Sequence, residues 1–326
     1  NKLPQLIVAI REQIIACGGE IHFEHKLTDV LVEHGRIVEL ELNGQQKVRV
    51  SNVILATGHS ARDIFHLLHK RHIEVKAKPF ALGVRVEHTQ AFIDKLQYHG
   101  RLNDEFLPPS SYSLVTQVDG RGVYSFCMCP GGIIAPCATD EQEVVTNGWS
   151  PSKRNNPFSN SGIVVSIDPT DFSNPEHPFV CLEFQQSIEK ASWEAAGRTQ
   201  KVPAQCLKDF VQQKKSTEFP RSSYQPGIIS VEMDEIFPSF VIDRLRKAFI
   251  DFDKKMPGFV TNDAVIHAPE SRTSSPVLIP RDPESWQHIS VSNLYPCAEG
   301  AGYAGGIVSA AIDGMNCVSK ICQKEA

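Results

Sequence analysis

The residues best suited to chemistry form a glycine cluster near the C-terminal end of the sequence, Glu299-Gly300-Ala301-Gly302-Tyr303-Ala304-Gly305-Gly306. Gly300, Gly302 and Gly305 fit the spacing GxGxxG, after a short apolar run and before a helical pattern. Glycines let a backbone turn sharply and approach a ligand, and a helix N-terminus offers free N–H groups to an anion or a polar ring. Glu299 could accept a hydrogen bond from a ligand hydroxyl. The cluster therefore predicts a ligand-binding strand–helix turn, and a tight turn that binds nothing is the alternative.

This cluster does not open a complete dinucleotide-binding unit. Such a unit needs a second strand with an acidic ribose ligand ~20 residues further on. The sequence ends at Ala326, and the residues after the cluster read as one helix with a short polar tail. We therefore expect a later cofactor-contacting turn of a larger α/β protein.

A second glycine follows an apolar run far upstream. Residues 52–56 are nearly all apolar and lead into Thr57 and Gly58, and a helical pattern follows over residues 61–72. A continuous apolar run is typical of a strand that is buried on both faces, as in a parallel sheet. The sequence thus predicts a second turn of the order strand, glycine, helix.

These two turns resemble the two later flavin-binding motifs of the FAD-dependent oxidoreductases. More narrowly, the sequence resembles a family of uncharacterised bacterial FAD/NAD-utilising dehydrogenases over essentially its whole length. The similar stretches are Asn1-Lys2-Leu3-Pro4, Ala56-Thr57-Gly58-His59-Ser60-Ala61-Arg62-Asp63, Cys127-Met128-Cys129-Pro130-Gly131-Gly132, Glu270-Ser271-Arg272-Thr273-Ser274-Ser275-Pro276 and the cluster from Glu299 to Gly306. The resemblance implies an α/β fold, with an FAD/NAD(P)-binding, Rossmann-like (three-layer) remnant and a large inserted α+β domain.

The resemblance also implies a cofactor site. Thr57 and Gly58 would pass close to the dinucleotide part of FAD, Glu299 would lie at its ribityl or pyrophosphate region, and residues 302–306 would cover the isoalloxazine edge. The two turns would therefore meet at one cofactor, although they are distant in the chain. The implied cofactor-binding set is Ala56, Thr57, Gly58, Arg272, Glu299, Gly300, Gly302, Tyr303, Ala304, Gly305 and Gly306.

The activity implied is hydride transfer between FAD and an unknown small-molecule substrate, with NAD(P)H as the candidate electron donor. No catalytic acid or base is assigned. The family carries a first strand–GxGxxG–helix unit before the segment that matches Asn1, and that unit is absent here. We therefore expect a C-terminal part of a longer flavoprotein, with the missing N-terminal segment as a partner. Alone, the chain should hold FAD weakly or not at all and purify colourless.

Two further groups are candidates for the same site. Arg272 lies among hydroxyl residues and could bind a phosphate or the carbonyl edge of the flavin, or form a surface salt bridge. A loop that ends a strand of the insertion could face the flavin on its substrate side, because Pro–Gly–Gly allows close approach. The substrate-side candidates are Cys129, Pro130, Gly131 and Gly132. Cys127 and Cys129 are predicted to be structural thiols, because a bond between them would be short and strained.

No metal site is predicted. Four histidines bunch around the helix after Gly58, but a solvated helix face explains them better than a metal pair. They are His59, His66, His69 and His72. The nine cysteines show no CxxC and no zinc-like spacing, which favours mostly structural thiols in a reduced, cytoplasmic setting.

Three segments would position these motifs. Residues 1–76 are predicted to be the first part of the FAD-binding domain, residues 77–267 the inserted substrate or cap domain, and residues 268–326 the C-terminal part of the FAD-binding domain. Predicted helices cover residues 3–15, 61–72, 187–197, 204–215, 237–256 and 307–322. Predicted strands cover residues 20–24, 27–33, 36–42, 46–50, 52–56, 80–87, 123–127, 162–166 and 179–184, and predicted loops cover residues 155–162 and 168–178.

The length and the net charge of the chain further narrow the range of possible functions. At ~100–200 residues per domain, 326 residues suggest about two domains. A net charge of −5 and a pI of 6.2 argue against a broadly basic surface, so nucleic acid is not expected as a partner. A relative of the tRNA-modifying flavoproteins stays an alternative, because a local basic groove is compatible with this charge. A non-enzymatic binding module on a degenerate flavin fold is another. No apolar run approaches the ~18 residues of a membrane helix, so no membrane partner is expected.

Overall fold

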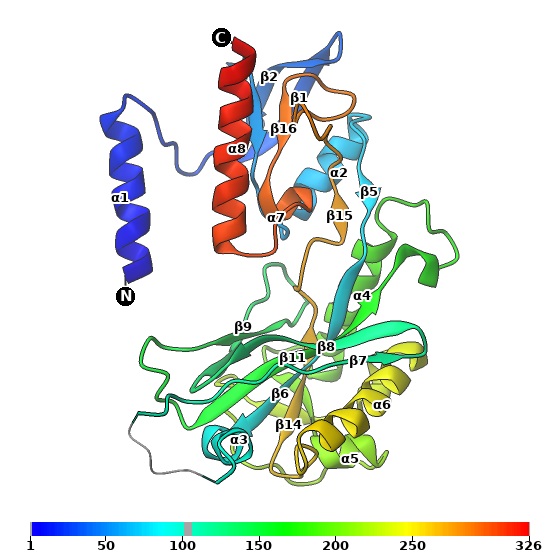
Figure 1. Ribbon diagram of the computed structural model, residues 1–326. Coiled ribbons are helices and arrows are strands. Elements are labelled where there is room, and N and C mark those ends of the chain that lie inside the picture. Colours follow the sequence, from blue (N-terminus) through cyan, green and yellow to red (C-terminus); the bar gives the residue numbers. More distant parts are fainter. Residues whose placement is uncertain (1, 101–105, 326) are drawn as a thin grey trace. The chain divides into compact units, whose positions relative to one another are not determined.

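The computed structural model describes residues 2–100 and 106–325 and divides the chain into two compact units (Figure 1). Unit 1 comprises residues 1–75, 279–301 and 308–326, and unit 2 comprises residues 76–278 and 302–307. Asn1, which opens the first of the similar stretches, lies outside the described residues. The functional labels that the sequence suggests for residues 1–76, 77–267 and 268–326 stay a prediction.

Unit 1 begins with a helix and a three-stranded antiparallel meander. They are α1 (Lys2–Ala16), β1 (Leu27–Glu33), β2 (Arg36–Leu42) and β3 (Gln46–Arg49). The turns at Gly35 and Gly44 both have positive φ, which glycine tolerates, and the three predicted strands that they join are present. The strand predicted over residues 20–24 is wrong. That segment pairs with no described strand, and His22 and His25 bond instead to groups two residues before them in the chain.

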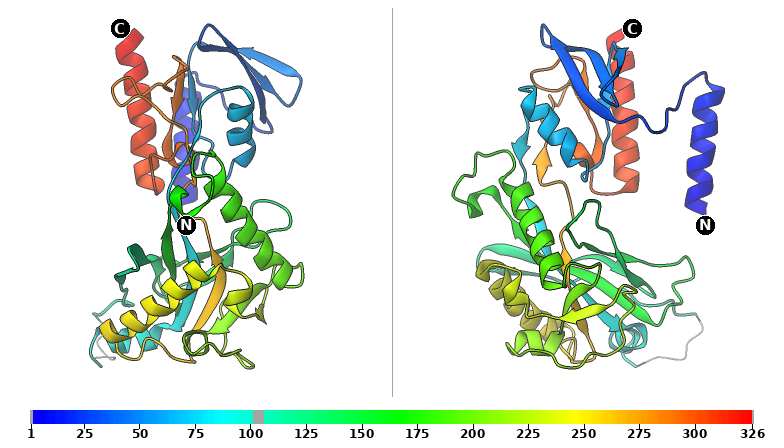
Figure 2. Two further views of the ribbon diagram at one scale, coloured as in Figure 1. Left: turned by 90° about the vertical axis from the view of Figure 1, so that its right-hand side faces the viewer. Right: turned by 180° about the vertical axis from the view of Figure 1, so that it is seen from behind.

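A two-stranded parallel sheet forms the centre of unit 1. β4 (Val53–Leu55) pairs with β16 (Leu294–Pro296), with Val53 opposite Leu294 and Leu55 opposite Pro296. Helix α2 (Arg62–Lys70) follows β4, and α7 (Ala298–Ala301) and α8 (Ile307–Glu325) follow β16. The predicted parallel pairing is present, but burial on both faces is wrong, because Ile54 is 38% exposed. Figure 2 shows α8 alongside β16, against which it packs through Cys317 and Ile321.

Unit 2 is built on a seven-stranded mixed sheet. Only β12 and β13 pair in parallel within it. The strands, in spatial order, are β13 (Ile228–Ser230), β12 (Val202–Cys206), β14 (Val265–Glu270), β6 (Phe80–Thr89), β11 (Phe158–Ile167), β8 (Arg121–Cys129) and β7 (Val115–Val118). Unit 2 also contains two separate two-stranded antiparallel sheets: β9 (Ile133–Pro136) with β10 (Thr146–Trp149), and β5 (Lys76–Ala77) with β15 (Val277–Leu278).

Helices cover this sheet and enclose the main hydrophobic core. They are α3 (Gln90–Gln97), α4 (Val180–Ala195), α5 (Leu207–Val211) and α6 (Ser239–Lys255), with short 3-10 turns at Pro169–Asp171 and Met233–Glu235. Alternate residues of β6, such as Val84 and Val86, join Phe249 and Phe252 of α6 in the core. Arg85 and Glu87 alternate with them and are also buried. The two units together give a mixed α/β fold.

Three sequence-based assignments in unit 2 are wrong, and non-local pairing or packing explains each. Residues 179–184 belong mostly to α4 rather than to a strand, since Cys181, Gln185 and Ile188 are buried at helical spacing. Residues 158–162, predicted as part of a loop, belong to β11, whose polar residues pair with β6. Residues 204–206, predicted as helix, pair with β14 as part of β12.

Within the described ranges, no helix is both long and apolar enough to cross a membrane.

Candidate functional site: two glycine turns of unit 1

The two glycine turns singled out from the sequence are in contact within unit 1. β4 and β16 run side by side in the same direction, so their carboxyl ends lie together. A Cβ atom placed on Gly300 would lie 2.6 Å from the carbonyl oxygen of Gly58 and 2.9 Å from its nitrogen. Side chains do not tolerate such distances to a backbone, so only glycine at position 300 lets the turns meet. Gly58 itself has φ +77°.

A polar pair lies beside this contact. The Nε2 atom of His59 is 3.8 Å from the Oε2 atom of Glu299, and these side chains are 23% and 32% exposed. The Oγ of Ser60 lies 3.3 Å from the Nδ1 of His59. Glu299 is in the first turn of α7, three residues beyond β16, rather than at the strand end itself. The pair therefore offers a partly exposed carboxylate and imidazole next to the glycine contact.

The space in front of the first turn is open. A Cβ atom on Gly58 would meet no atom within 4 Å. Ala56 and Thr57, which precede it, are exposed. The described atoms therefore leave space beside this turn in the direction of a Gly58 side chain.

The second half of the glycine cluster, residues 302–306, groups with unit 2. Gly302 has φ +87°, and a Cβ there would lie 3.0 Å from side-chain atoms of Leu278 and Lys78. Burial lowers the pKa of Lys78 below its ordinary value. A Cβ on Gly305 would meet nothing within 4 Å, and Tyr303 is 37% exposed. Ala304 and Gly306 are half-buried. The positive φ at position 302 thus favours glycine there, and Gly305 borders open space.

Arg272 has a set of partners that the sequence did not reveal. Its Nε donates to Glu189 at 2.7 Å, and its Nη2 donates to Glu143 at 2.9 Å. The three side chains are at most 5% exposed, so the ion pairs are buried and not on the surface. Ser271 also donates to Glu189, at 2.6 Å. Two carboxylates already balance the charge of this guanidinium.

The Pro130-Gly131-Gly132 loop uses its glycines for packing within unit 2. A Cβ on Gly131, which has φ +51°, would overlap the carbonyl oxygen of Arg154, and one on Gly132 would lie 2.5 Å from the carbonyl oxygen of Trp149. The loop is buried, and Gly131 donates to the side chain of Gln90 at 2.6 Å. The close approach predicted from these glycines is therefore an approach to the protein's own backbone.

The neighbouring cysteines are not bonded to each other. Cys127 is exposed and Cys129 is partly buried, and neither takes part in a disulfide. The Cys129 thiol donates to the Cys127 carbonyl oxygen at 3.3 Å. Burial raises the pKa of Cys129 above its ordinary value, which keeps it protonated at neutral pH.

Sequence reasoning missed a cavity of about 420 Å³ in unit 2. Glu87 and His88 line it, together with Phe92, Phe158 and Arg221. Burial lowers the pKa of His88 to about 4, so its imidazole is neutral. Glu87 accepts hydrogen bonds from the backbone N–H and the hydroxyl of Ser223. The sequence did contain one signal of this cavity, namely charged residues inside the otherwise apolar strand β6.

The histidines near Gly58 take part in no three-residue group of potential metal ligands among the residues that the structure describes. The one such group found there comprises Cys297, Asp313 and Cys317, which sequence spacing did not suggest.

Comparison with known proteins identifies the family. Residues 79–273, more than half of the chain, match the family described as FAD-dependent protein, C-terminal domain-like. The chain belongs to this family. A protein of Clostridium beijerinckii, described as uncharacterised, is 38% identical over 326 residues. The match covers 99% of this chain and 61% of that protein, so the chain spans less than two thirds of the relative's length.

Membership in the FAD-dependent C-terminal-domain family agrees with the broader part of the sequence resemblance. The matched residues lie within unit 2, whereas the contact between Gly58 and Gly300 lies in unit 1, outside them. The family description names FAD and no reaction.

Proposed function

We propose that this chain is part of an FAD-dependent oxidoreductase and that the two glycine turns of unit 1 form one wall of its FAD site. The observation that carries this proposal is the contact between Gly58 and Gly300 at the carboxyl ends of two adjacent parallel strands. In open α/β sheets, ligands bind outside the carboxyl ends of the strands. The family description supports FAD as the ligand.

The residues present fit a flavin dinucleotide. Bare glycine backbone and open space at Gly58 would let a large planar or phosphate-bearing group approach closely. Glu299 would accept a hydrogen bond from a ribityl or ribose hydroxyl, and His59 would orient its carboxylate. Ala56 and Thr57 would line the approach.

Bound FAD would supply the redox chemistry, exchanging hydride with a substrate. The chain would position and shield it. On the strength of the resemblance, NAD(P)H is the proposed electron donor. Arg272 is left out of the proposed site, because Glu143 and Glu189 already hold it.

We further propose that the cavity within unit 2 binds a small molecule. This cavity of about 420 Å³ combines apolar walls with the polar groups of Glu87 and His88, as small-molecule sites commonly do. The loop from Cys129 to Gly132 would support such a site through its packing instead of touching substrate. We propose a reducing, cytoplasmic location, which nine cysteines outside any disulfide in the described chain support.

Two helices of unit 1 expose apolar residues, which supports the proposal that the functional protein is a longer polypeptide. α1 has no buried side chain and exposes Leu6, Ile7 and Ile10 by 50–60%. α8 exposes Val308 and Met315 by about 70%. Exposed apolar patches of this kind mark interaction surfaces. We propose that a further segment of the same protein covers them and completes the FAD site.

The test uses the full-length protein. We expect it to show flavin absorbance and to bind FAD saturably in a fluorescence titration. Glu299→Gln should weaken binding by roughly 10-fold or more, because a hydrogen bond to a charged acceptor contributes about 1.5–3 kcal/mol. Glu284→Gln is the matched control, since it removes the same charge from an exposed position of unit 1. A full-length protein that is colourless and binds no FAD would refute the proposal.

A further inference from the structure

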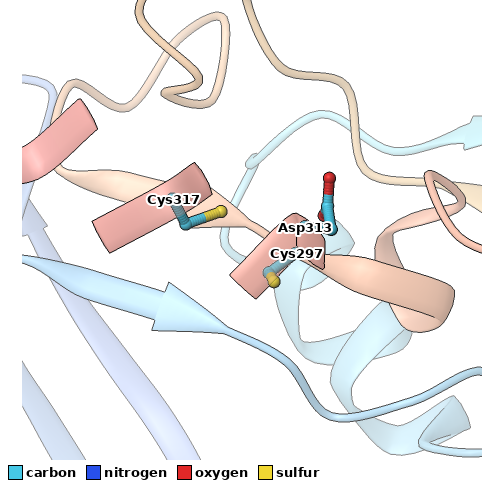
Figure 3. A group of neighbouring side chains, drawn as sticks. All are labelled: Cys297, Asp313 and Cys317. Atoms are coloured by element: carbon cyan, nitrogen blue, oxygen red, sulfur yellow. The ribbon is translucent and has the colours of Figure 1, made fainter. Parts of the chain in front are cut away.

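Two cysteines of unit 1 that are distant in the sequence bring their thiols together. Cys297 follows β16, and Cys317 lies on α8. Their Sγ atoms and a carboxylate oxygen of Asp313 all lie within 4.8 Å of one another. The two cysteines are 1% and 0% exposed. Figure 3 shows the side chain of Cys317 pointing toward Cys297 and Asp313.

An ion pair holds this arrangement in place. Asp313 and Cys317 are four residues apart on α8, so they share one helix face. Arg281 donates to both carboxylate oxygens of Asp313, at 2.9 and 2.7 Å, and to the carbonyl oxygen of Pro296 at 2.9 Å. The backbone N–H of Ala298 donates to Asp313 at 2.7 Å. The backbone on both sides of Cys297 is therefore tied to α8.

The two thiols are not equivalent. The hydrogen bond from the Cys297 thiol, together with the charge of Arg281, lowers the pKa of Cys317 below its ordinary value, although burial opposes this. The same hydrogen bond and burial raise the pKa of Cys297. Cys317 is therefore the sulfur that more readily becomes a thiolate, and Cys297 is its proton-bearing partner.

Thiols and a carboxylate are also metal-ligand types, but the carboxylate here is already engaged. Three N–H groups, two of them from a guanidinium, bond to the oxygens of Asp313. A metal ion would have to displace this cation or lie beside it. The two thiols are therefore the groups that remain available for chemistry.

We propose that Cys317 and Cys297 form a redox-active dithiol that a peroxide oxidises to an intrachain disulfide. The Cys317 thiolate attacks one oxygen of hydrogen peroxide, the O–O bond breaks, and a sulfenic acid forms while hydroxide leaves. Cys297 then loses its proton and attacks the Cys317 sulfur. The S–S bond forms, the S–O bond breaks, and the oxygen leaves as water. Two thiols and one peroxide thus give one disulfide and two waters.

This dithiol adjoins the glycine turns without depending on them. Cys297 immediately precedes α7, the helix that carries Glu299 and Gly300. A disulfide would join the start of that turn covalently to α8. Oxidation can therefore be measured in the protein whether or not it binds FAD, and a failure of either proposal leaves the other standing.

Peptide mass spectrometry after peroxide treatment tests the proposal. The protein is exposed to hydrogen peroxide, its remaining thiols are alkylated under denaturing conditions, and the digest is analysed. We expect a linked peptide joining Cys297 to Cys317, which dithiothreitol separates. In Cys297→Ser, we expect a Cys317 sulfenic acid that dimedone traps, since the resolving thiol is gone.

Cys181 is the matched internal control, because it is also 0% exposed and free. Burial, followed by the negative charges of Asp168 and Asp171, raises its pKa to about 12. We expect Cys317 to be oxidised at least about 10-fold faster than Cys181, since the thiolate is the reactive form. Equal rates, or the absence of the linked peptide in wild-type protein, would overturn the proposal. So would a thiolate–Co²⁺ absorption band that is lost in Cys317→Ser, which would show a metal site instead.

Discussion

Replacing Gly300 by alanine tests the contact on which the proposed cofactor site depends. The added Cβ would lie 2.6–2.9 Å from the oxygen, carbon and nitrogen of Gly58. These are backbone atoms, which cannot rotate away as the end of a flexible side chain can. Either the turn after β4 or the turn after β16 must shift by several tenths of an ångström. We expect Gly300→Ala to separate the two turns.

The size of the effect follows from the cost of forcing one methyl group into a packed site. Overpacking of this kind destabilises proteins by about 1–3 kcal/mol. For a unit of this size, 1 kcal/mol lowers the melting temperature by roughly 2–8 °C. We therefore expect the transition of unit 1 to move to a clearly lower temperature, while that of unit 2 stays in place because the clash lies wholly within unit 1.

Differential scanning calorimetry measures both transitions, and FAD titration of the full-length variant measures the site. Gly305→Ala is the control for the unfolding measurement, because its Cβ would meet nothing within 4 Å. We expect Gly300→Ala to weaken FAD binding at least about 10-fold, since a displaced turn loses contacts worth more than ~1.4 kcal/mol. Unchanged melting and unchanged FAD affinity in Gly300→Ala would refute the role of the contact.

Two further predictions concern unit 2. Glu189→Gln should destabilise it by roughly 3 kcal/mol in urea unfolding, because it leaves Arg272 with one carboxylate in a buried site. Asp119→Asn, which breaks an exposed ion pair, should have little effect, and equal effects would contradict the argument. The pKa of His88 is about 4 in the folded protein against an ordinary 6.5, so only the unfolded chain takes up this proton between those values. Stability should therefore fall by roughly 3 kcal/mol as the pH drops through this range. His88→Gln should flatten that fall in pH-dependent unfolding, and an unchanged fall in this variant would contradict the argument.

Local signals in the sequence were sufficient where structure depends on neighbouring residues. The two strands on either side of Gly35 and the long helix α6 were predicted close to their observed bounds, because strand alternation and helical periodicity act over a few positions. The glycine cluster also identified a real strand–helix turn. Its Gly300 proved to need glycine because of the opposite turn, and not because of the residues beside it.

Tertiary structure decided every feature that depends on partners far along the chain. The run from Phe179 became helix, and polar Asn160 became part of a buried strand, because each packs against elements that periodicity does not reveal. Arg272 donates hydrogen bonds to the buried carboxylates of Glu189 and Glu143, which are 83 and 129 residues away in the sequence. The sequence alone specified which residues can turn, bond or ionise. Only the tertiary structure determined which of these residues are in contact. The energy of a contact depends on the distance between the groups in space and on their burial, and the spacing of residues along the chain specifies neither.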